Sequence, residues 1–133
     1  MADALVFPVE EIPDADSVFM RAHETYCRDG EVMPGVFTAK NGGMSVDWDK
    51  YSTKEETRQR AKNPAKNGVL RLAVGAIRGI DDLDVQHRPL PTNRAHSEVD
   101  LPTNEELTEV RIFLLRIAEV VISLPAGRPP GHA

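Results

Sequence analysis

The chain has 133 residues, a length that fits a single domain of ordinary size. Hydrophobic residues make up 41% and charged residues 28%, which is typical of a soluble globular protein and excludes a disordered one. No apolar run approaches the roughly 18 residues that a membrane span needs, and no basic segment of the secretory type precedes the first apolar residues. We therefore expect a cytoplasmic protein without a membrane segment.

Charge is distributed unevenly along the chain. Residues 1–16 contain five acidic and no basic side chains, which accounts for the whole net charge of −5. A basic segment follows between residues 50 and 71, and it could meet a nucleic acid through Lys54, Arg58, Lys62 and Lys66. No aromatic residue stands among these four, as a nucleic-acid surface would require, so a solvated helix face is the favoured interpretation.

Alternating apolar and polar residues predict most of the strands. After the acidic leader, in which residues 5–7 are a candidate edge strand, we expect strands over 17–22, 36–39, 44–48, 68–74, 83–88 and 95–99. Arg28-Asp29-Gly30 predicts a turn, and the two prolines of residues 89–93 predict a stiff connection. In 44–48 the apolar Met44, Val46 and Trp48 should face inward.

Two capping boxes predict helices. Ser52 with Glu55 begins a surface helix that ends before Pro64, over residues 52–62. Thr103 with Glu106 begins a helix of about 20 residues, to Ser123. Its apolar stripe consists of Leu107, Val110, Leu114, Ile117 and Val121. Residues 75–79 could add one helical turn.

These elements predict a single α+β domain over residues 17–124. Its mostly antiparallel sheet of four to six short strands should be covered on one face by the long helix of residues 103–123. Residues 1–16 form an extended acidic leader, and residues 125–133 form a flexible tail.

Motifs of cofactor and metal chemistry are missing from the sequence. There is no Gly-x-Gly-x-x-Gly, Walker-type loop, His-Glu-x-x-His, EF-hand loop or Gly-x-Ser-x-Gly, so no cofactor is predicted. His23 and Cys27 would share a face only if their segment were helical, and a strand ending near His23 argues against that metal site.

A set of polar residues near strand ends carries the remaining chemistry. Histidine is the commonest general acid or base, and arginine can hold a phosphate through two parallel hydrogen bonds. The candidate catalytic residues are His23, His87 and His96, and the candidate substrate-binding residues are Arg21, Ser45 and Asp47. Together they could form an anion-binding catalytic pocket. The alternative is that each histidine binds a backbone carbonyl and that Arg21 pairs with an acidic neighbour.

Several segments also resemble an uncharacterised family of small bacterial proteins over roughly residues 17–100. The resemblance lies in Phe-Met-Arg-Ala-His at 19–23, Met-Ser-Val-Asp-Trp at 44–48 and the Pro- and His-containing stretch at 87–96. Its motifs are an Arg-x-His, a Ser-Val-Asp and a proline a few residues before an Ala-His pair. The corresponding residues here are Arg21, His23, Ser45, Asp47, Pro91, Ala95 and His96. The resemblance implies no reaction.

Two functions therefore compete. The chain is either an interaction or accessory protein of a bacterial multi-protein system, acting on a protein partner through its leader, basic helix and sheet edge, or an enzyme that acts on a nucleotide or RNA phosphate. In the enzyme, Arg21 binds the phosphate and His23 works with His87 or His96 in proton transfer. The interaction protein is slightly favoured because spacing alone completes no catalytic constellation. Convergence of Arg21, His23, Asp47 and His96 in one pocket would favour the enzyme.

Overall fold

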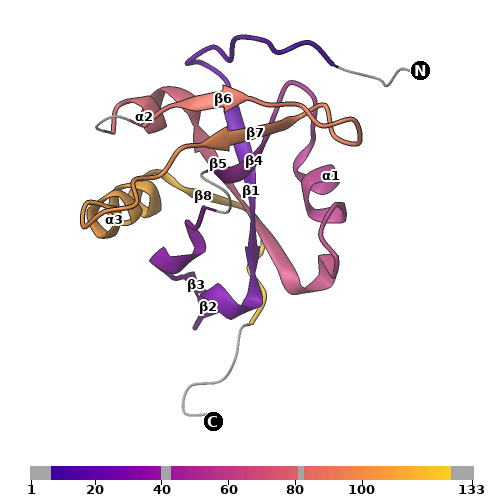
Figure 1. Cartoon of the computed structure of the whole chain (residues 1–133). Helices are drawn as coiled ribbons and strands as arrows, with labels where there is room; N and C mark the ends of the chain where they lie inside the picture. Colours follow the sequence, from indigo (N-terminus) through magenta and orange to yellow (C-terminus); the bar gives the residue numbers. More distant parts are fainter. Residues whose placement is uncertain (1–6, 40–42, 81–82, 127–133) are drawn as a thin grey trace.

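A six-stranded, wholly antiparallel sheet forms the centre of the molecule (Figure 1), with the strand order β6-β7-β4-β1-β5-β8. This computed structural model describes residues 7–39, 43–80 and 83–126. The sheet strands are β1 (Ser17–His23), β4 (Met44–Trp48), β5 (Asn67–Ala73), β6 (Val85–His87), β7 (His96–Val99) and β8 (Glu119–Ile122). The α-helices are α1 (Lys54–Gln59), α2 (Val74–Arg78) and α3 (Leu107–Ile117). The α+β class and the antiparallel sheet are thus confirmed.

Strand β1 organises the sheet because it pairs with β5 along its whole length and with β4 on its other edge. Its alternate residues Val18, Met20 and Ala22 are buried on one face, opposite Leu70 and Leu72 of β5. The predicted inward residues of β4 are buried on the same face and join the same core cluster. One face of the sheet is therefore the apolar core, and the other carries the polar residues of the alternation.

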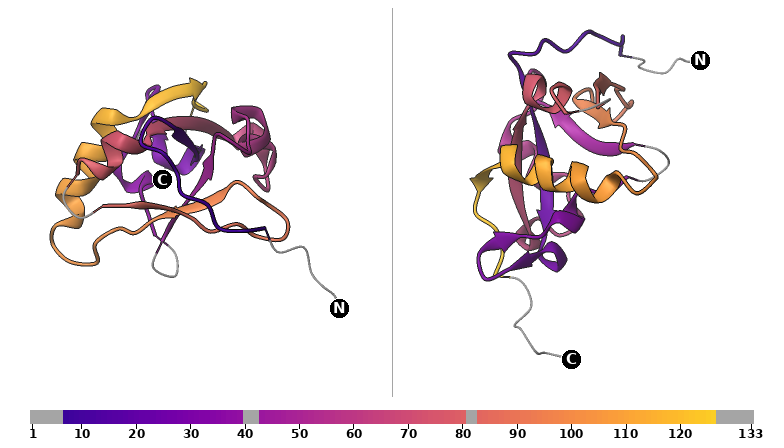
Figure 2. Two further views of the ribbon diagram at one scale, coloured as in Figure 1. Left: turned by 90° about the horizontal axis from the view of Figure 1, so that it is seen from above. Right: turned by 90° about the vertical axis from the view of Figure 1, so that its left-hand side faces the viewer.

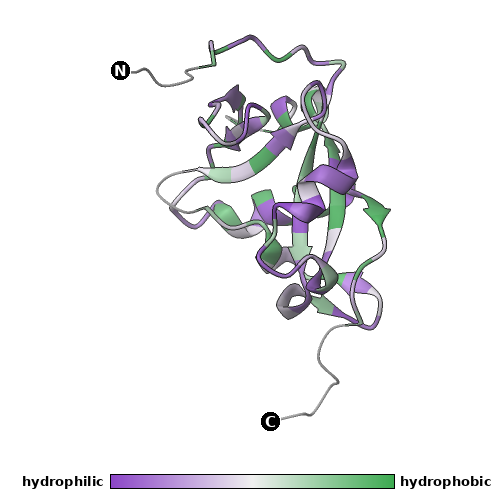
Figure 3. Ribbon diagram, turned by 90° about the vertical axis from the view of Figure 1, so that its right-hand side faces the viewer, coloured by the Kyte–Doolittle hydropathy of each residue, from purple (hydrophilic) through white to green (hydrophobic). Residues whose placement is uncertain are grey.

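Helices α1 and α3 lie on opposite sides of the central strands, as Figures 1 and 2 show. Val110 and Leu114 of α3 are buried in the core cluster. Helix α1 is hydrophilic along its whole length (purple in Figure 3), and Thr57 is its one buried residue. The apolar face of the sheet thus receives α3, and the polar face receives α1. Among the described residues, no helix is long and apolar enough to cross a membrane.

The predicted long C-terminal helix is wrong in its extent. Helix α3 has 11 residues, Ala118 is extended with φ −73° and ψ 137°, and residues 119–122 form strand β8 on the edge of β5. The Thr103 capping box is not formed, because the helix begins after Glu106, which makes no side-chain cap. Val120, Val121 and Ile122 are β-branched, so pairing with β5 suits them better than further helical turns.

Smaller differences concern loops and helix starts. The strand predicted over 36–39 is not formed; a 3₁₀ turn occupies Pro34–Val36 instead. The capping box of α1 is formed by Thr53 and Glu56, one residue later than predicted, and the helix is shorter than predicted, from Lys54 to Gln59. The predicted turn is confirmed: Asp29 and Gly30 both have positive φ and join β2 (Cys27–Arg28) to β3 (Glu31–Val32), as a tight two-residue hairpin requires.

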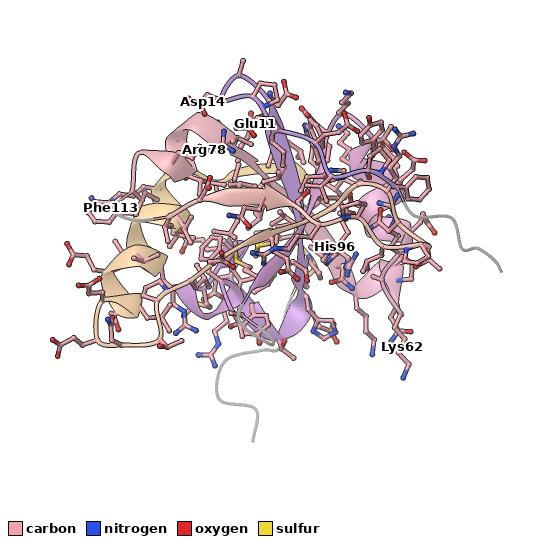
Figure 4. The ribbon with its side chains drawn as sticks, turned by 45° about the horizontal axis from the view of Figure 1, so that its top comes forward. Glu11, Asp14, Lys62, Arg78, His96 and Phe113 are labelled. Atoms are coloured by element: carbon pink, nitrogen blue, oxygen red, sulfur yellow. The ribbon has the colours of Figure 1, made fainter. Side chains whose placement is uncertain are left out.

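The described part of the leader, residues 7–16, runs without strand structure over one end of the sheet (Figures 1 and 2). Ile12 is buried in the core cluster, and Asp16 accepts a hydrogen bond from Trp48 Nε1 at 2.9 Å. Arg78 donates to the Ile12 carbonyl and to Asp14, both at 2.7 Å (Figure 4). Leu5 and Val6, and the predicted tail from residue 127, lie outside the described residues. Residues 7–16 are therefore part of the folded body.

Glu10 fixes the leader through a cluster of polar groups. Its carboxylate accepts hydrogen bonds from Lys50 Nζ at 2.8 Å and from the Tyr51 hydroxyl, and Arg94 lies 3.6 Å away. These contacts, the Lys50 bond first, lower the pKa of Glu10 from 4.5 to about 2. A carboxyl group whose pKa is lower in the folded state than in the unfolded state stabilises the fold at pH values above its unfolded pKa. This stabilisation is lost as the pH falls through the folded pKa.

We expect Glu10→Gln to abolish this part of the acid sensitivity. The wild-type protein should lose the contribution of Glu10 between pH about 4.5 and about 2, and the variant should lack that contribution at every pH. Urea unfolding at pH 7 and at pH 3 measures it, with the exposed neighbour Glu11→Gln as the control. Equal acid destabilisation of the Glu10 variant and the wild type would contradict the cluster.

Candidate functional site

Five of the six predicted site residues line one pocket, with a volume of about 470 Å³. They come from three neighbouring strands: Arg21 and His23 from β1, Ser45 and Asp47 from β4, and His96 from β7. In Figure 4, His96 lies over the middle of the sheet. The structure thus brings together residues that are up to 75 positions apart in the chain.

The register of the sheet explains this convergence. Asp47 is paired with Phe19 on one side and with His96 on the other. Residues two positions apart on a strand point to the same face, so Arg21 and Ser45 share the face of Asp47. This face is opposite the apolar core, and α1 lies against it. The polar face of three strands and α1 therefore line part of the pocket, and Met20, Met44 and Val46 of the apolar face line another part.

The predicted catalytic residue His87 is not in the pocket. It pairs with Ser97, one position from His96, so it points to the opposite face and is buried there. Its Nδ1 accepts the N–H of Glu10 at 3.0 Å, and its Nε2 lies 2.7 Å from the carbonyl of Arg94, to which it must donate. Both ring nitrogens of His87 thus bind backbone groups. This agrees with the alternative that the histidines bind backbone carbonyls instead of acting in catalysis.

Asp47 is the centre of a hydrogen-bond network at the pocket wall. Asp47 is 4% exposed, and its carboxylate accepts hydrogen bonds from Thr57 Oγ1 at 2.9 Å, from Arg60 at 2.8 Å and from Asn93 Nδ2 at 2.9 Å. Arg60 also donates to Ser52 Oγ at 2.8 Å. With three donors satisfied within the protein, this carboxylate serves to hold α1 and the 90–93 turn against β4.

Two arginines give the pocket its positive charge. Arg21 donates to the backbone carbonyl of Thr57 at 3.1 Å, and Arg60 pairs with Asp47. Each guanidinium has five N–H donors, so these bonds use only part of its capacity. One lining carboxylate, Asp47, stands against two lining arginines. The lining as a whole is therefore cationic.

The two pocket histidines have different hydrogen-bond partners. His96 Nδ1 lies 2.9 Å from the carbonyl of Arg88, which can only accept, so Nδ1 carries the proton. In the neutral ring Nε2 is then an acceptor, and the hydroxyl of Ser45 lies 3.3 Å from it. His23 Nδ1 instead accepts the backbone N–H of Thr25 at 3.2 Å, which places the proton of its neutral ring on Nε2. One histidine is thus set to accept a proton and the other to donate one.

Sequence reasoning missed Thr57, Arg60 and Asn93. Thr57 is in α1 and Arg60 is its C-cap residue, so their spacing of three places both on one helical face. The burial of Thr57 that reveals its polar contact is visible only in the structure. Asn93 belongs to the tight connection in which Leu90 and Asn93 bond to each other. Its role depends on the pairing of β4 with β7, which the local sequence does not specify.

The basic segment is partly engaged within the fold. Arg58 Nε donates to the carbonyls of Pro64 and Asn67, both at 3.0 Å, and Lys66 lies 3.7 Å from Glu24. Lys62 points outward from the body in Figure 4. Arg58 therefore has a structural role that the predicted solvated face did not include, and a nucleic-acid partner for Lys54, Arg58, Lys62 and Lys66 stays a prediction.

Among the residues that the structure describes, no cluster of three or more His, Cys, Asp or Glu side chains is arranged to hold a metal ion. Cys27 is buried, and its thiol donates to the carbonyl of His23 at 3.5 Å rather than facing the His23 ring. Burial raises the pKa of the Cys27 thiol.

No known protein family, curated protein or solved structure matches the chain.

Proposed function

We propose that the chain is an enzyme that binds a nucleotide or an RNA end by its phosphate in the sheet pocket and transfers a proton there through His96 and His23. The observation that carries this proposal is the convergence of Arg21, Arg60, His23 and His96 on one pocket. These residues come from three different elements, so local helix or strand formation does not account for their meeting.

Charge and size both suit such a ligand. Arginine binds phosphate oxygens through parallel N–H groups, and two arginines with one carboxylate leave a positive surplus for an anion. A volume of about 470 Å³ falls within the range of about 300–1,000 Å³ of small-molecule sites. A mononucleotide, free or at the end of an RNA strand, is therefore the proposed ligand.

The hypothesis that the chain is an interaction protein has less support, because the charged groups it would use make contacts within the fold. Three acidic residues of the leader, Glu10, Asp14 and Asp16, bind groups of the body, and Arg58 binds carbonyls. Helix α3 does expose Ile112 and Phe113, so a protein partner there stays the alternative. Absence of ligand binding by the pocket would favour that alternative.

We expect calorimetric titration with ADP at pH 7 to show binding to the wild-type protein. Arg21→Ala should weaken this binding by at least about tenfold, since a hydrogen bond to a charged group contributes about 1.5–3 kcal/mol.

The matched control is Arg71→Ala, which removes an exposed arginine that pairs with Glu119 outside the pocket lining. It should bind ADP like the wild type. A short oligoribonucleotide with a 5′-phosphate, titrated beside ADP, distinguishes an RNA end from a free nucleotide. If neither ligand produces heat at millimolar concentration, the pocket does not bind nucleotide phosphate and the proposal fails.

A further inference from the structure

We propose that the hydroxyl of Ser45 is a nucleophile that takes up the phosphoryl group of the bound ligand and passes it to water. This inference rests on the proposed function, because it assigns a reaction to the same pocket. It is carried by a second observation, the pairing of an exposed serine with an oriented histidine: Ser45 Oγ lies 3.3 Å from His96 Nε2.

The two side chains meet diagonally across paired strands. In the β4–β7 register Ser45 is opposite Glu98 and Asp47 is opposite His96, so Ser45 and His96 are diagonal neighbours on one face. A long or aromatic side chain can span such a diagonal. A serine and a histidine within hydrogen-bond reach are the arrangement in which an imidazole activates a hydroxyl, and the distance is commonly somewhat long before substrate binds.

A third group fixes the histidine ring. The carbonyl of Arg88 accepts from His96 Nδ1 at 2.9 Å, and the N–H of Arg88 donates to the carbonyl of His96 at 3.0 Å. The same two residues are thus joined by a backbone bond and by a ring-to-backbone bond. This arrangement holds Nε2 as the acceptor that points toward Ser45, which is the orienting role that a third group has in a catalytic triad.

Ser45 is also the serine that a ligand can reach. Ser17, Ser52 and Ser97 are buried, and Ser45 is the one serine in the pocket lining. Its exposed hydroxyl sits in the cationic pocket of Arg21 and Arg60. Arginines stabilise charge on the oxygens of a transferring phosphoryl group, so phosphoryl transfer suits this serine better than acyl transfer does.

The proposed steps balance as a hydrolysis. Ser45 Oγ forms a bond to phosphorus while the bond from phosphorus to the leaving oxygen breaks. His96 Nε2 takes the hydroxyl proton of Ser45 and gives it to that leaving oxygen. In the second step His96 removes a proton from water, the water oxygen bonds to phosphorus, and the bond between phosphorus and Ser45 Oγ breaks. The proton returns to Ser45, and the products are the leaving alcohol or phosphate and a free phosphate.

A fluorophosphonate tests the nucleophile without requiring the natural substrate. Ser45 Oγ should bond to its phosphorus with loss of fluoride, and peptide mass spectrometry should place the label on Ser45. Ser45→Ala should eliminate the label, and His96→Gln should slow labelling by about 100-fold or more, the usual contribution of a general base. Ser123→Ala, which removes an exposed serine outside the pocket lining, is the control and should label like the wild type.

The pH profile separates catalysis from a structural role of His96. The labelling rate should rise as pH increases from 5 to 8, because only the neutral ring can accept the proton, and the profile should be flat in His96→Gln. Labelling of wild-type Ser45 at the rate of Ser123 would overturn the nucleophile. If Ser45 is labelled but titration with ADP produces no heat, the nucleotide ligand alone is refuted. If titration with ADP produces heat but Ser45 is not labelled, the nucleophile alone is refuted.

Discussion

Replacing Leu114 by alanine is expected to lower the free energy of unfolding by about 2–5 kcal/mol, the usual range for a buried leucine. Leu114 is fully buried in the middle of α3 and belongs to the core cluster together with Val110. The substitution removes apolar contacts and leaves a cavity in the core, because the surrounding structure relaxes only partly. Urea denaturation followed by Trp48 fluorescence measures the change.

Ile112→Ala is the matched control on the same helix. Ile112 is 42% exposed, so its truncation should cost less than about 1 kcal/mol, and alanine is the better helix former. A loss below about 1 kcal/mol for Leu114→Ala as well would mean that α3 does not cover the apolar face in solution. The packing layer that the apolar stripe predicts would then be wrong.

The strands of the sheet could be predicted from alternation because half-buried strands expose every second residue. Met44, Val46 and Trp48 are buried as expected, and β1 and β5 begin and end within one residue of the prediction. The strand order could not be predicted. It depends on which edges pair across loops of very different length, and no local pattern encodes that choice.

The C-terminal helix shows where periodicity becomes ambiguous. Val121 stands four residues after Ile117, so it continues a helical stripe, but Val120 to Ile122 is also a β-branched run. The free edge of β5 decides between the two, since β8 pairs with it. This tertiary contact is absent from any local window of the sequence.

The candidate site could be predicted in its residue types and in part of its membership. Arg21 with His23, and Ser45 with Asp47, are spaced by two and therefore share a face wherever their strands lie. His87 and His96 belong to opposite faces because of the β6–β7 register, and neither strand shows that register by itself. Arg60 reaches the site only because α1 lies on the polar face of the sheet.

Replacing Asp47 by alanine is expected to lower the free energy of unfolding by about 2–4 kcal/mol. The carboxylate accepts from Thr57, Arg60 and Asn93, and a hydrogen bond contributes about 0.5–1.5 kcal/mol, or about 1.5–3 kcal/mol when one group is charged. Thr57 can still donate to Ser52 Oγ at 2.9 Å, and Arg60 can turn toward water. The loss in free energy of unfolding is therefore smaller than the loss expected when a buried charge is left without any partner. Thermal and urea unfolding measure it.

The control for Asp47 is Asp100→Ala, since Asp100 also pairs with an arginine, Arg88, but at the surface. Exposed ion pairs contribute about 0–1 kcal/mol, so this variant should unfold nearly like the wild type. Asp47→Asn should fall between the two, because it keeps one acceptor oxygen and the packing but turns an amide toward Arg60. If Asp47→Ala were no more destabilising than Asp100→Ala, the network would not hold α1 and the 90–93 turn to β4. The pocket wall built on that network would then lack its anchor.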